Sequence, residues 1–216
     1  PVTERVLRSL PQIGIVSRYG AGFDTVDTAA CARHGVWVAN SPDYGVGEVA
    51  THALGLALAI TRNIVAYHRD ITARDQWHYL SSGKLRRPRE LTLGIVGLGR
   101  IGKRMAQVSR DVFARVVAYD HGPAARAALS AEPGVTVVAS LDALVATLAP
   151  PRIGWLMLPA GAPTDSTLDV LGGSMGRGDL LVDGGNAHYR DSQRRAASLE
   201  ALGLQFRQIA ILRYGA

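Results

Sequence analysis

The stretch LTLGIVGLGRIGKRMAQVSRDVFARVVAYD, residues 91–120, decides the fold. It opens with an apolar run typical of a buried strand and then carries Gly97, Gly99 and Gly102 in the spacing G-x-G-x-x-G. An amphipathic helical pattern follows, and a second apolar run ends at Asp120, 18 residues after Gly102. Glycines at this spacing are weak evidence alone, but strand, turn, helix, strand and terminal acid together predict a dinucleotide-binding βαβ unit.

The residues of this turn suit the binding of a pyrophosphate. Gly97 permits a tight turn, Gly99 lets a phosphate approach the backbone, and Gly102 lets the helix pack closely on the strand. The amides at the start of the helix, around Arg100 and Ile101, lie at the positive end of the helix dipole, where anions bind. The Arg100 side chain adds a positive charge at the same place.

Asp120 is expected to select the cofactor. Its carboxylate would accept hydrogen bonds from the adenosine ribose hydroxyls and would repel a 2′-phosphate, which favours NAD over NADP. The alternative role is a cap for the helix that begins near Pro123. His121 and Arg126 are close in sequence and could hold a 2′-phosphate, so NADP remains the less favoured cofactor.

Apolar runs and helical patterns alternate regularly from residue 91 onward. This alternation predicts an α/β fold with a doubly wound parallel sheet, the Rossmann fold, and assigns 91–216 to a dinucleotide-binding domain. The expected strands are 92–97, 115–119, 135–139, 153–158, 180–184 and 204–212. The expected helices are 100–113, 123–131, 141–148, 164–175 and 189–202.

The first part of the chain predicts a smaller unit. Residues 1–45 give a short helix, an apolar run within QIGIVSRYGAGFD, a helix over 26–34 and a strand over 36–40, which is a truncated parallel βαβ piece. Residues 46–70 are apolar almost all round a helix, so we expect one long helix buried between two bodies. With the polar segment that follows, 46–90 form an interdomain helix and connector.

The composition is that of a globular protein, with 47% hydrophobic and 19% charged residues in a chain of 216. No apolar stretch reaches the roughly 20 residues that cross a bilayer, so no membrane partner is expected. Pro1 stands where an initiator Met would, and no signal peptide follows, which indicates an internal starting point. The single cysteine, Cys31, fits a cytoplasmic location, and its helical context predicts a buried apolar thiol.

Two further classes of partner are not indicated. The net charge is +6, but the densest basic run, KLRRPRE at 84–90, has no interleaved aromatic residues. We expect a solvated connector there and no nucleic-acid partner. The sequence has no cluster of Cys and His at metal-ligand spacing, so no metal site is expected.

Residues 1–120 resemble the D-isomer-specific 2-hydroxyacid dehydrogenases, near the branch of phosphoglycerate dehydrogenase and C-terminal-binding proteins. The resemblance rests on SRYGAGFDTVD, GVWVANSPDYGVGEVATHALGLALAI, WHYLSSGKLRR and TLGIVGLGRIGKRMA. It implies that 1–45 are part of a flavodoxin-like substrate domain, in which the amides of Gly20, Ala21 and Gly22 bind a substrate carboxylate. It also implies hydride transfer with a 2-hydroxy acid and a homodimer.

The catalytic side chains of that family find no counterpart here. The family ends its fifth strand with Asn-x-x-Arg-Gly, where the arginine holds the carboxylate, but this sequence has Asp183-Gly184-Gly185-Asn186-Ala187. Asn186 carries no charge, and the later Glu and Pro-His positions are not matched before Ala216. The catalytic residues are therefore unknown.

Residues 123–207 instead resemble 6-phosphogluconate dehydrogenase. The resemblance rests on SLDALVATLAPPRIGWLMLPAGAPTDSTLDVL and on GDLLVDGGNAHYRDSQRRAASLEALGLQF. It implies that Asn186 approaches both the nicotinamide ribose and the substrate, and we expect Leu158 and Pro159 beside the cofactor. The alternative for Asn186 is a turn residue before the following helix.

The two resemblances meet near 121–123, after the second strand of the sheet, and we interpret the chain as a chimera of two dehydrogenase families. Three functions follow. The first is an NAD-dependent oxidoreductase, or its cofactor-binding portion, acting on a 2-hydroxy acid. The second is an oxidoreductase of the 6-phosphogluconate dehydrogenase type, and the third is an NAD-binding module without turnover.

Overall fold

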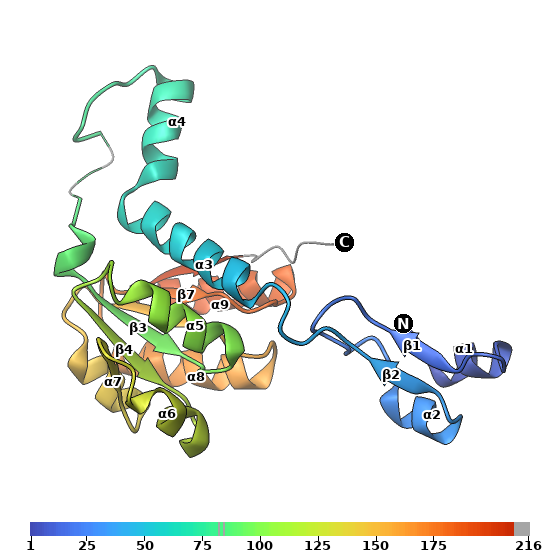
Figure 1. The fold of residues 1–216 in the computed structure, drawn as a ribbon. Helices are drawn as coiled ribbons and strands as arrows, with labels where there is room; N and C mark the ends of the chain where they lie inside the picture. The colour runs from blue at the N-terminus through green and yellow to red at the C-terminus, as the bar shows by residue number, and fades with distance from the viewer. Residues whose placement is uncertain (82, 84, 210–216) are drawn as a thin grey trace. The chain divides into compact units, whose positions relative to one another are not determined.

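The computed structural model describes residues 1–81, 83 and 85–209. The chain divides into two compact units, one formed by Pro1–Val46 and the other beginning at Gly47 (Figure 1). Each unit has its own hydrophobic core, and each is described separately below.

The first unit is a small parallel βαβ piece. Strands β1 (Ile15–Ser17) and β2 (Trp37–Ala39) pair in parallel, and α2 (Thr28–Arg33) connects them after α1 (Glu4–Ser9). The Asp27 carboxylate caps α2 by accepting a hydrogen bond from the amide of Ala30. The core of this unit contains the buried Cys31, so the expectation of an apolar interior thiol is confirmed.

The second unit contains a six-stranded parallel sheet in the order β5-β4-β3-β6-β7-β8. Numbered within the unit this is 3-2-1-4-5-6, the order of a doubly wound dinucleotide-binding fold, so the predicted fold class is confirmed. The strands are β3 (Thr92–Val96), β4 (Arg115–Tyr119), β5 (Val135–Val137), β6 (Ile153–Leu156), β7 (Leu180–Asp183) and β8 (Gln205–Gln208). Most are shorter than predicted, and residues 210–212 of the last predicted strand lie outside the described part of the chain.

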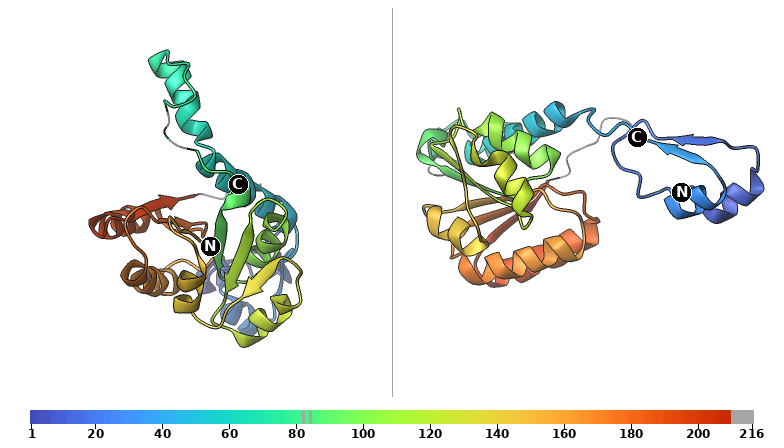
Figure 2. Two further views of the ribbon diagram at one scale, coloured as in Figure 1. Left: turned by 90° about the vertical axis from the view of Figure 1, so that its left-hand side faces the viewer. Right: turned by 60° about the horizontal axis from the view of Figure 1, so that its bottom comes forward.

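Helices cover both faces of this sheet, which explains why its strands are nearly continuous apolar runs (Figure 2). One face packs on α3, α5 and α6 through residues such as Ala53, Met105 and Leu129. The other packs on α7, α8 and α9 through Leu144, Leu171 and Leu199. The helices are α3 (Val46–Thr61), α5 (Arg100–Ser109), α6 (Pro123–Ser130), α7 (Leu141–Thr147), α8 (Ala162–Ser174) and α9 (Tyr189–Ala201).

The prediction of one long buried helix over 46–70 is wrong. The structure has α3 and a separate α4 (Ile64–Arg74), because Asn63 adopts a left-handed backbone with φ of 52° and breaks the ladder. Only the small side chains along one stripe of α3 are buried, and Asp70 is the buried residue of α4. Among the described residues no single helix has the length and apolarity to cross a membrane, and α3 with α4 meets that test only as a pair bent by 59°.

A candidate dinucleotide site at the carboxyl ends of the strands

The predicted cofactor residues of the second unit meet at one edge of the sheet. Gly97 follows β3, Asp120 follows β4, Leu158 and Pro159 follow β6, and Asn186 follows β7. Strands β4 and β6 lie on opposite sides of β3, so the chain changes winding direction at β3. In doubly wound sheets a crevice opens at this switch point, outside the carboxyl ends of the strands.

The glycine turn is fixed by close backbone contacts. Gly97 has a φ of +93°, and a Cβ there would lie 2.6 Å from the carbonyl oxygen of Met157. A Cβ on Gly102 would lie only 1.9 Å from the carbonyl oxygen of Gly97. Both positions therefore require glycine for packing, as the sequence predicts.

Gly99 is different, because a Cβ there would meet nothing within 4 Å. Its φ and ψ, −59° and −178°, are accessible to other residues, so packing does not explain this glycine. Gly99 is the N-cap of α5 and has no side chain with which to cap the amides at the positive end of this helix. The open space and the helix amides together suit a pyrophosphate, with Arg100 exposed and Ile101 half-buried beside them.

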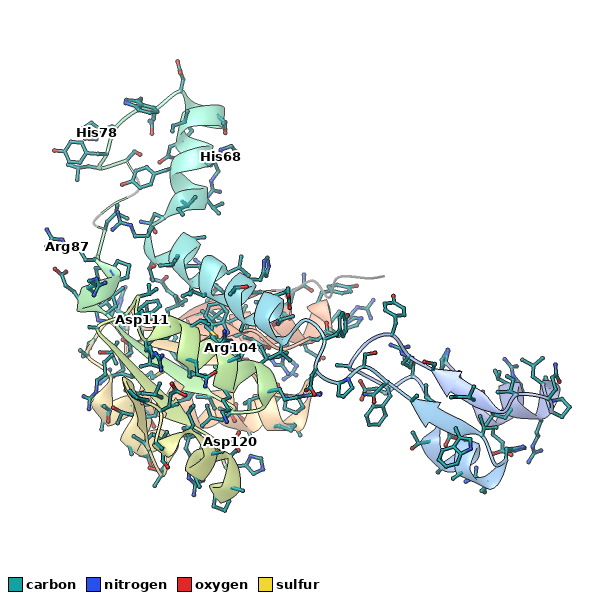
Figure 3. The ribbon with its side chains drawn as sticks, viewed as in Figure 1. His68, His78, Arg87, Arg104, Asp111 and Asp120 are labelled. Carbon is teal, nitrogen blue, oxygen red and sulfur yellow. The ribbon has the colours of Figure 1, made fainter. Side chains whose placement is uncertain are left out.

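Asp120 is held against the glycine turn (Figure 3). Its Oδ2 accepts a hydrogen bond of 2.6 Å from the Leu98 amide, and its Oδ1 accepts one of 2.7 Å from Gly122. The N-cap of α6 is Gly122 itself, and the two bonds of the Asp120 carboxylate go to the Leu98 and Gly122 amides, both before the first residue of that helix. The alternative of a helix cap is therefore not supported, and Asp120 lies where the carboxylate of a dinucleotide site is expected.

The neighbours of Asp120 are partly engaged with the backbone. Arg126 donates from Nη1 to the carbonyl oxygens of Asp120 and His121, at 2.6 and 3.0 Å. The exposed His121 ring lies 3.4 Å from the Asp120 carboxylate. Arg126 therefore adds to the fixation of this corner.

The loop after β7 packs tightly against the end of β6. A Cβ on Gly184 would lie 2.6 Å from Nε1 of Trp155, and one on Gly185 would lie 2.7 Å from the carbonyl oxygen of Leu158. The two glycines are thus required by packing, and they bring the loop beside Leu158. Asn186 follows them and is exposed, so its amide group is accessible to a ligand.

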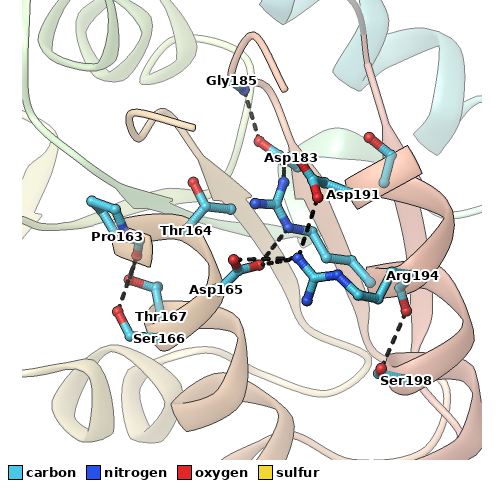
Figure 4. Close-up of polar contacts among 12 residues, drawn as sticks. Pro163, Thr164, Asp165, Ser166, Thr167, Asp183, Gly185, Asp191, Arg194 and Ser198 are labelled. Atoms are coloured by element: carbon cyan, nitrogen blue, oxygen red, sulfur yellow. Dashed lines mark hydrogen bonds and ion pairs between the residues drawn. The ribbon is translucent and has the colours of Figure 1, made fainter. Parts of the chain in front are cut away.

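A buried charged network lies beneath this loop (Figure 4). Asp183 accepts hydrogen bonds from the Gly185 amide at 2.8 Å and from Nη1 of Arg195 at 3.0 Å. Arg195 also donates from Nε to Asp165 of α8 at 2.8 Å, and the more exposed Arg194 pairs with the same carboxylate at 3.3 Å. Burial raises the pKa of Asp183 despite the opposing effect of the Gly185 amide and Arg195. The hydrogen bond from Arg195 lowers the pKa of Asp165.

Sequence reasoning missed this network. A signal was present, since Ser192, Arg195 and Leu199 recur at helical spacing and form the buried face of α9. An arginine on the core face of a helix needs a buried partner. The acid at the end of the preceding strand, Asp183, was the available candidate.

The predicted substrate loop lies in the first unit. Gly20, Ala21 and Gly22 follow β1, and the Asn40 side chain donates a hydrogen bond of 2.8 Å to the carbonyl oxygen of Ala21. The Ser41 amide donates to the carbonyl oxygen of Gly20 at 3.3 Å. The loop is therefore anchored through its carbonyl groups. Across the described ranges, no three Cys, His, Asp or Glu side chains are grouped as a metal site would need.

Comparison with known proteins supports NAD as the cofactor. Residues 92–211 match the family described as the NAD binding domain of 6-phosphogluconate dehydrogenase. The match begins at β3 and includes both the glycine turn and the loop that carries Asn186. It identifies the second unit as an NAD-binding domain.

Individual relatives come from two enzyme groups. D-3-phosphoglycerate dehydrogenase of Mycobacterium tuberculosis is 40% identical over 145 residues, which are 67% of this chain and 26% of that protein. An NAD(+)-dependent, decarboxylating 6-phosphogluconate dehydrogenase of Haloferax volcanii is 40% identical over 111 residues, or 51% of this chain and 37% of that protein. The solved D-mandelate dehydrogenase of Rhodotorula graminis has a TM-score of 0.73 at 25% identity, and the aligned region covers 94% of this chain and 60% of that chain. This chain thus spans less than two thirds of each of these relatives.

Proposed function

Because the chain belongs to the family of the NAD binding domain of 6-phosphogluconate dehydrogenase, we propose that it is the cofactor-binding portion of an oxidoreductase that acts on a hydroxy acid. The observation that carries the proposal is the open space at Gly99, between the amino end of α5 and the carboxylate of Asp120. In this arrangement the helix amides hold the pyrophosphate, and Asp120 accepts hydrogen bonds from the adenosine ribose.

The opposite half of the cofactor belongs at the ends of β6 and β7. Leu158 and Pro159 would border the nicotinamide side, and the exposed amide of Asn186 would bind its ribose and the substrate. When bound, the nicotinamide ring accepts or supplies the hydride. The protein positions the ring and excludes water from one side of it.

The substrate is proposed to be a small hydroxy acid, with the amides of Gly20, Ala21 and Gly22 binding its carboxylate. The alternative, a substrate of the 6-phosphogluconate type, is favoured by the Asp183–Asn186 loop and by the family match. We assign no catalytic base. For the isolated chain we therefore retain the third candidate function, which is NAD binding without turnover.

Titration with reduced cofactors tests this proposal. We expect NADH to bind more tightly than NADPH, and Asp120→Asn to reduce that preference by about tenfold, because the variant loses one charge beside the ribose. The matched control is Asp111→Asn, which removes an exposed carboxylate beyond the other end of α5 and should leave both affinities unchanged (Figure 3). Absence of NADH binding, or tighter binding of NADPH by the unmodified protein, would contradict the proposal.

Turnover separates the candidate reactions. The protein is incubated with NAD and a panel of 2-hydroxy acids or 6-phosphogluconate, and NADH is followed by its absorbance. Activity with a 2-hydroxy acid supports the first function, activity with 6-phosphogluconate supports the second, and binding without turnover supports the third.

We also propose a homodimer formed through α4 and the segment after it. Ile64, Val65 and Ile71 of α4 are exposed, as are Trp77 and Leu80 in the following segment. Apolar side chains concentrated in this way usually mark an interface. Sedimentation should show a dimer, and Val65→Lys with Trp77→Ser should yield a monomer that still binds NADH. A monomeric unmodified protein would contradict the proposed homodimer.

We further propose that the protein is located in the cytoplasm and has no nucleic-acid or membrane partners.

A further inference from the structure

The peptide group of Gly185 is held from both sides. Its amide donates to Oδ1 of Asp183 at 2.8 Å, and its carbonyl oxygen accepts a hydrogen bond of 3.0 Å from Nε2 of Gln208. Asp183 and Gln208 are register partners in the β7–β8 pair, so the two contacts come from adjacent strands. Gly185 directly precedes Asn186, and these bonds therefore limit where the Asn186 backbone can lie.

Helix α9 fixes both of these partners. Arg195 donates from Nη1 to Asp183 at 3.0 Å, and Ser192, one turn earlier, donates from Oγ to Oε1 of Gln208 at 2.9 Å. Arg195 is itself oriented by Asp165 of α8. We call Ser192, Arg195, Asp183 and Gln208 the α9 clamp.

The α9 clamp is a costly way to stabilise a fold. The side chains of Arg195 and Asp183 are only 3% and 1% exposed, and burial of such a pair costs about as much as the attraction returns. Within the described residues, Nη2 of Arg195 is buried without a hydrogen-bond partner, which adds to the cost. An apolar pair of similar volume would stabilise this site at least as well. What the polar pair adds is a fixed direction for the Gly185 amide.

We propose that Arg195 and Gln208 are positioning residues for the nicotinamide half of the cofactor site. They act through Gly185 on Asn186, and the inference rests on the proposed function, which places Asn186 at the nicotinamide ribose. The adenosine half depends on Gly99, the start of α5 and Asp120, which lie at the ends of β3 and β4. Loosening the α9 clamp should therefore weaken one half of the site and spare the other.

Two ligands separate the halves. ADP carries the adenosine and both phosphates but neither nicotinamide nor its ribose, whereas NADH carries all of them. Calorimetric titration of each ligand gives two dissociation constants for every variant of the full chain. A positioning role changes their ratio, whereas a general loss of structure weakens both ligands together.

The first variant is Arg195→Lys, which keeps a positive charge beside Asp183 but loses the planar fork that joins Asp183 to Asp165. The second is Gln208→Met, which keeps the shape of the side chain and removes the bond to Gly185. The matched control is Arg194→Lys, since the neighbouring Arg194 is 58% exposed and pairs with Asp165 and Asp191 outside the α9 clamp.

We expect both test variants to raise the dissociation constant of NADH by about tenfold and to change that of ADP by less than about twofold. The control should change neither. Equal weakening of the two ligands, or an unchanged NADH affinity in the folded variants, overturns the inference. If Arg195→Lys loses its circular dichroism signal, Gln208→Met decides alone. Failure of the unmodified protein to bind either ligand contradicts the proposed function instead.

Discussion

Alanine at Gly102 should destabilise the protein by overpacking, whereas alanine at Gly99 should destabilise it less and should weaken cofactor binding. A Cβ on Gly102 would lie 1.9 Å from the carbonyl oxygen of Gly97, about 1.5 Å inside an ordinary contact. That oxygen belongs to Gly97, whose amide donates a hydrogen bond of 2.8 Å to the carbonyl oxygen of Tyr119 in β4, so α5 itself must move away. Overpacking of this kind costs about 1–3 kcal/mol.

At Gly99 the added methyl group meets no protein atom within 4 Å, and the backbone angles are ones that alanine adopts. We therefore expect Gly99→Ala to lower the free energy of unfolding by at most about 1 kcal/mol, the difference between glycine and alanine at an N-cap. The methyl group instead occupies the space assigned to the pyrophosphate. Loss of NADH affinity should be at least about 100-fold, equivalent to about 2.7 kcal/mol.

Urea denaturation followed by circular dichroism measures the first quantity, and calorimetric titration with NADH measures the second. Gly173→Ala is the matched control, because Gly173 is exposed in α8 with nothing within 4 Å of its Cβ. It should stabilise the protein by about 0.5–1 kcal/mol and leave NADH binding unchanged. If Gly99→Ala binds NADH as tightly as the unmodified protein, the pyrophosphate does not lie at this turn and the proposed function loses its basis.

Two further predictions concern electrostatics away from the cofactor. Glu4 accepts hydrogen bonds from His34 and Arg33, and these bonds, that from His34 most of all, lower the pKa of Glu4 to about 2. Because the lowered pKa means that the ionised carboxylate stabilises the folded state, the first unit should lose stability as the pH falls from about 4.5 to 2. Glu4→Gln should abolish this acid dependence in urea titrations monitored by tryptophan fluorescence, and a persistent dependence would contradict it. Asp179→Ala leaves Arg152 without its buried partner and should cost about 3 kcal/mol. Asp179 precedes β7 at its amino end, so NADH affinity measured by calorimetry should not change.

The fold of the second unit could be predicted because its determinants are local. Gly97, Gly99, Gly102 and Asp120 lie within 24 consecutive residues, and the parallel strands are apolar runs because helices cover both faces of the sheet. Strand ends were less predictable. The apolar run of β6 continues through residues 157 and 158, but pairing stops at Leu156, since apolar character reports burial and not hydrogen bonding.

The prediction failed where apolar character was not confined to one stripe. In α3 the alternation of alanine and leucine gives no strong preference for a buried face, and the structure buries small residues such as Ala50 while His52 is exposed. The break at Asn63 depends on one left-handed residue, which asparagine tolerates but does not require.

The α9 clamp was unpredictable for another reason. Its members come from α9, β7 and β8, and Asp165, which orients Arg195 from outside the clamp, lies in α8, so no short window of sequence contains the pattern. A buried arginine and an exposed one, such as Arg195 and Arg194, are adjacent and identical in type. Only the direction of each side chain on the helix separates their roles.

On our interpretation the chain joins two families near 121–123, and the contacts between β3 and β6 explain why one sheet can hold both. Backbone pairing is independent of side chains, so a strand of one family can pair with a strand of another when the surfaces match sterically. Gly94 of β3 lies opposite Gly154 of β6 in the register, and each would place a Cβ 2.8 Å from a leucine. Gly94 thus leaves room for Leu148 at the end of α7, and Gly154 leaves room for Leu181 of β7. In the proposed function the cofactor spans the same boundary, with its adenosine half at the ends of β3 and β4 and its nicotinamide half at the ends of β6 and β7.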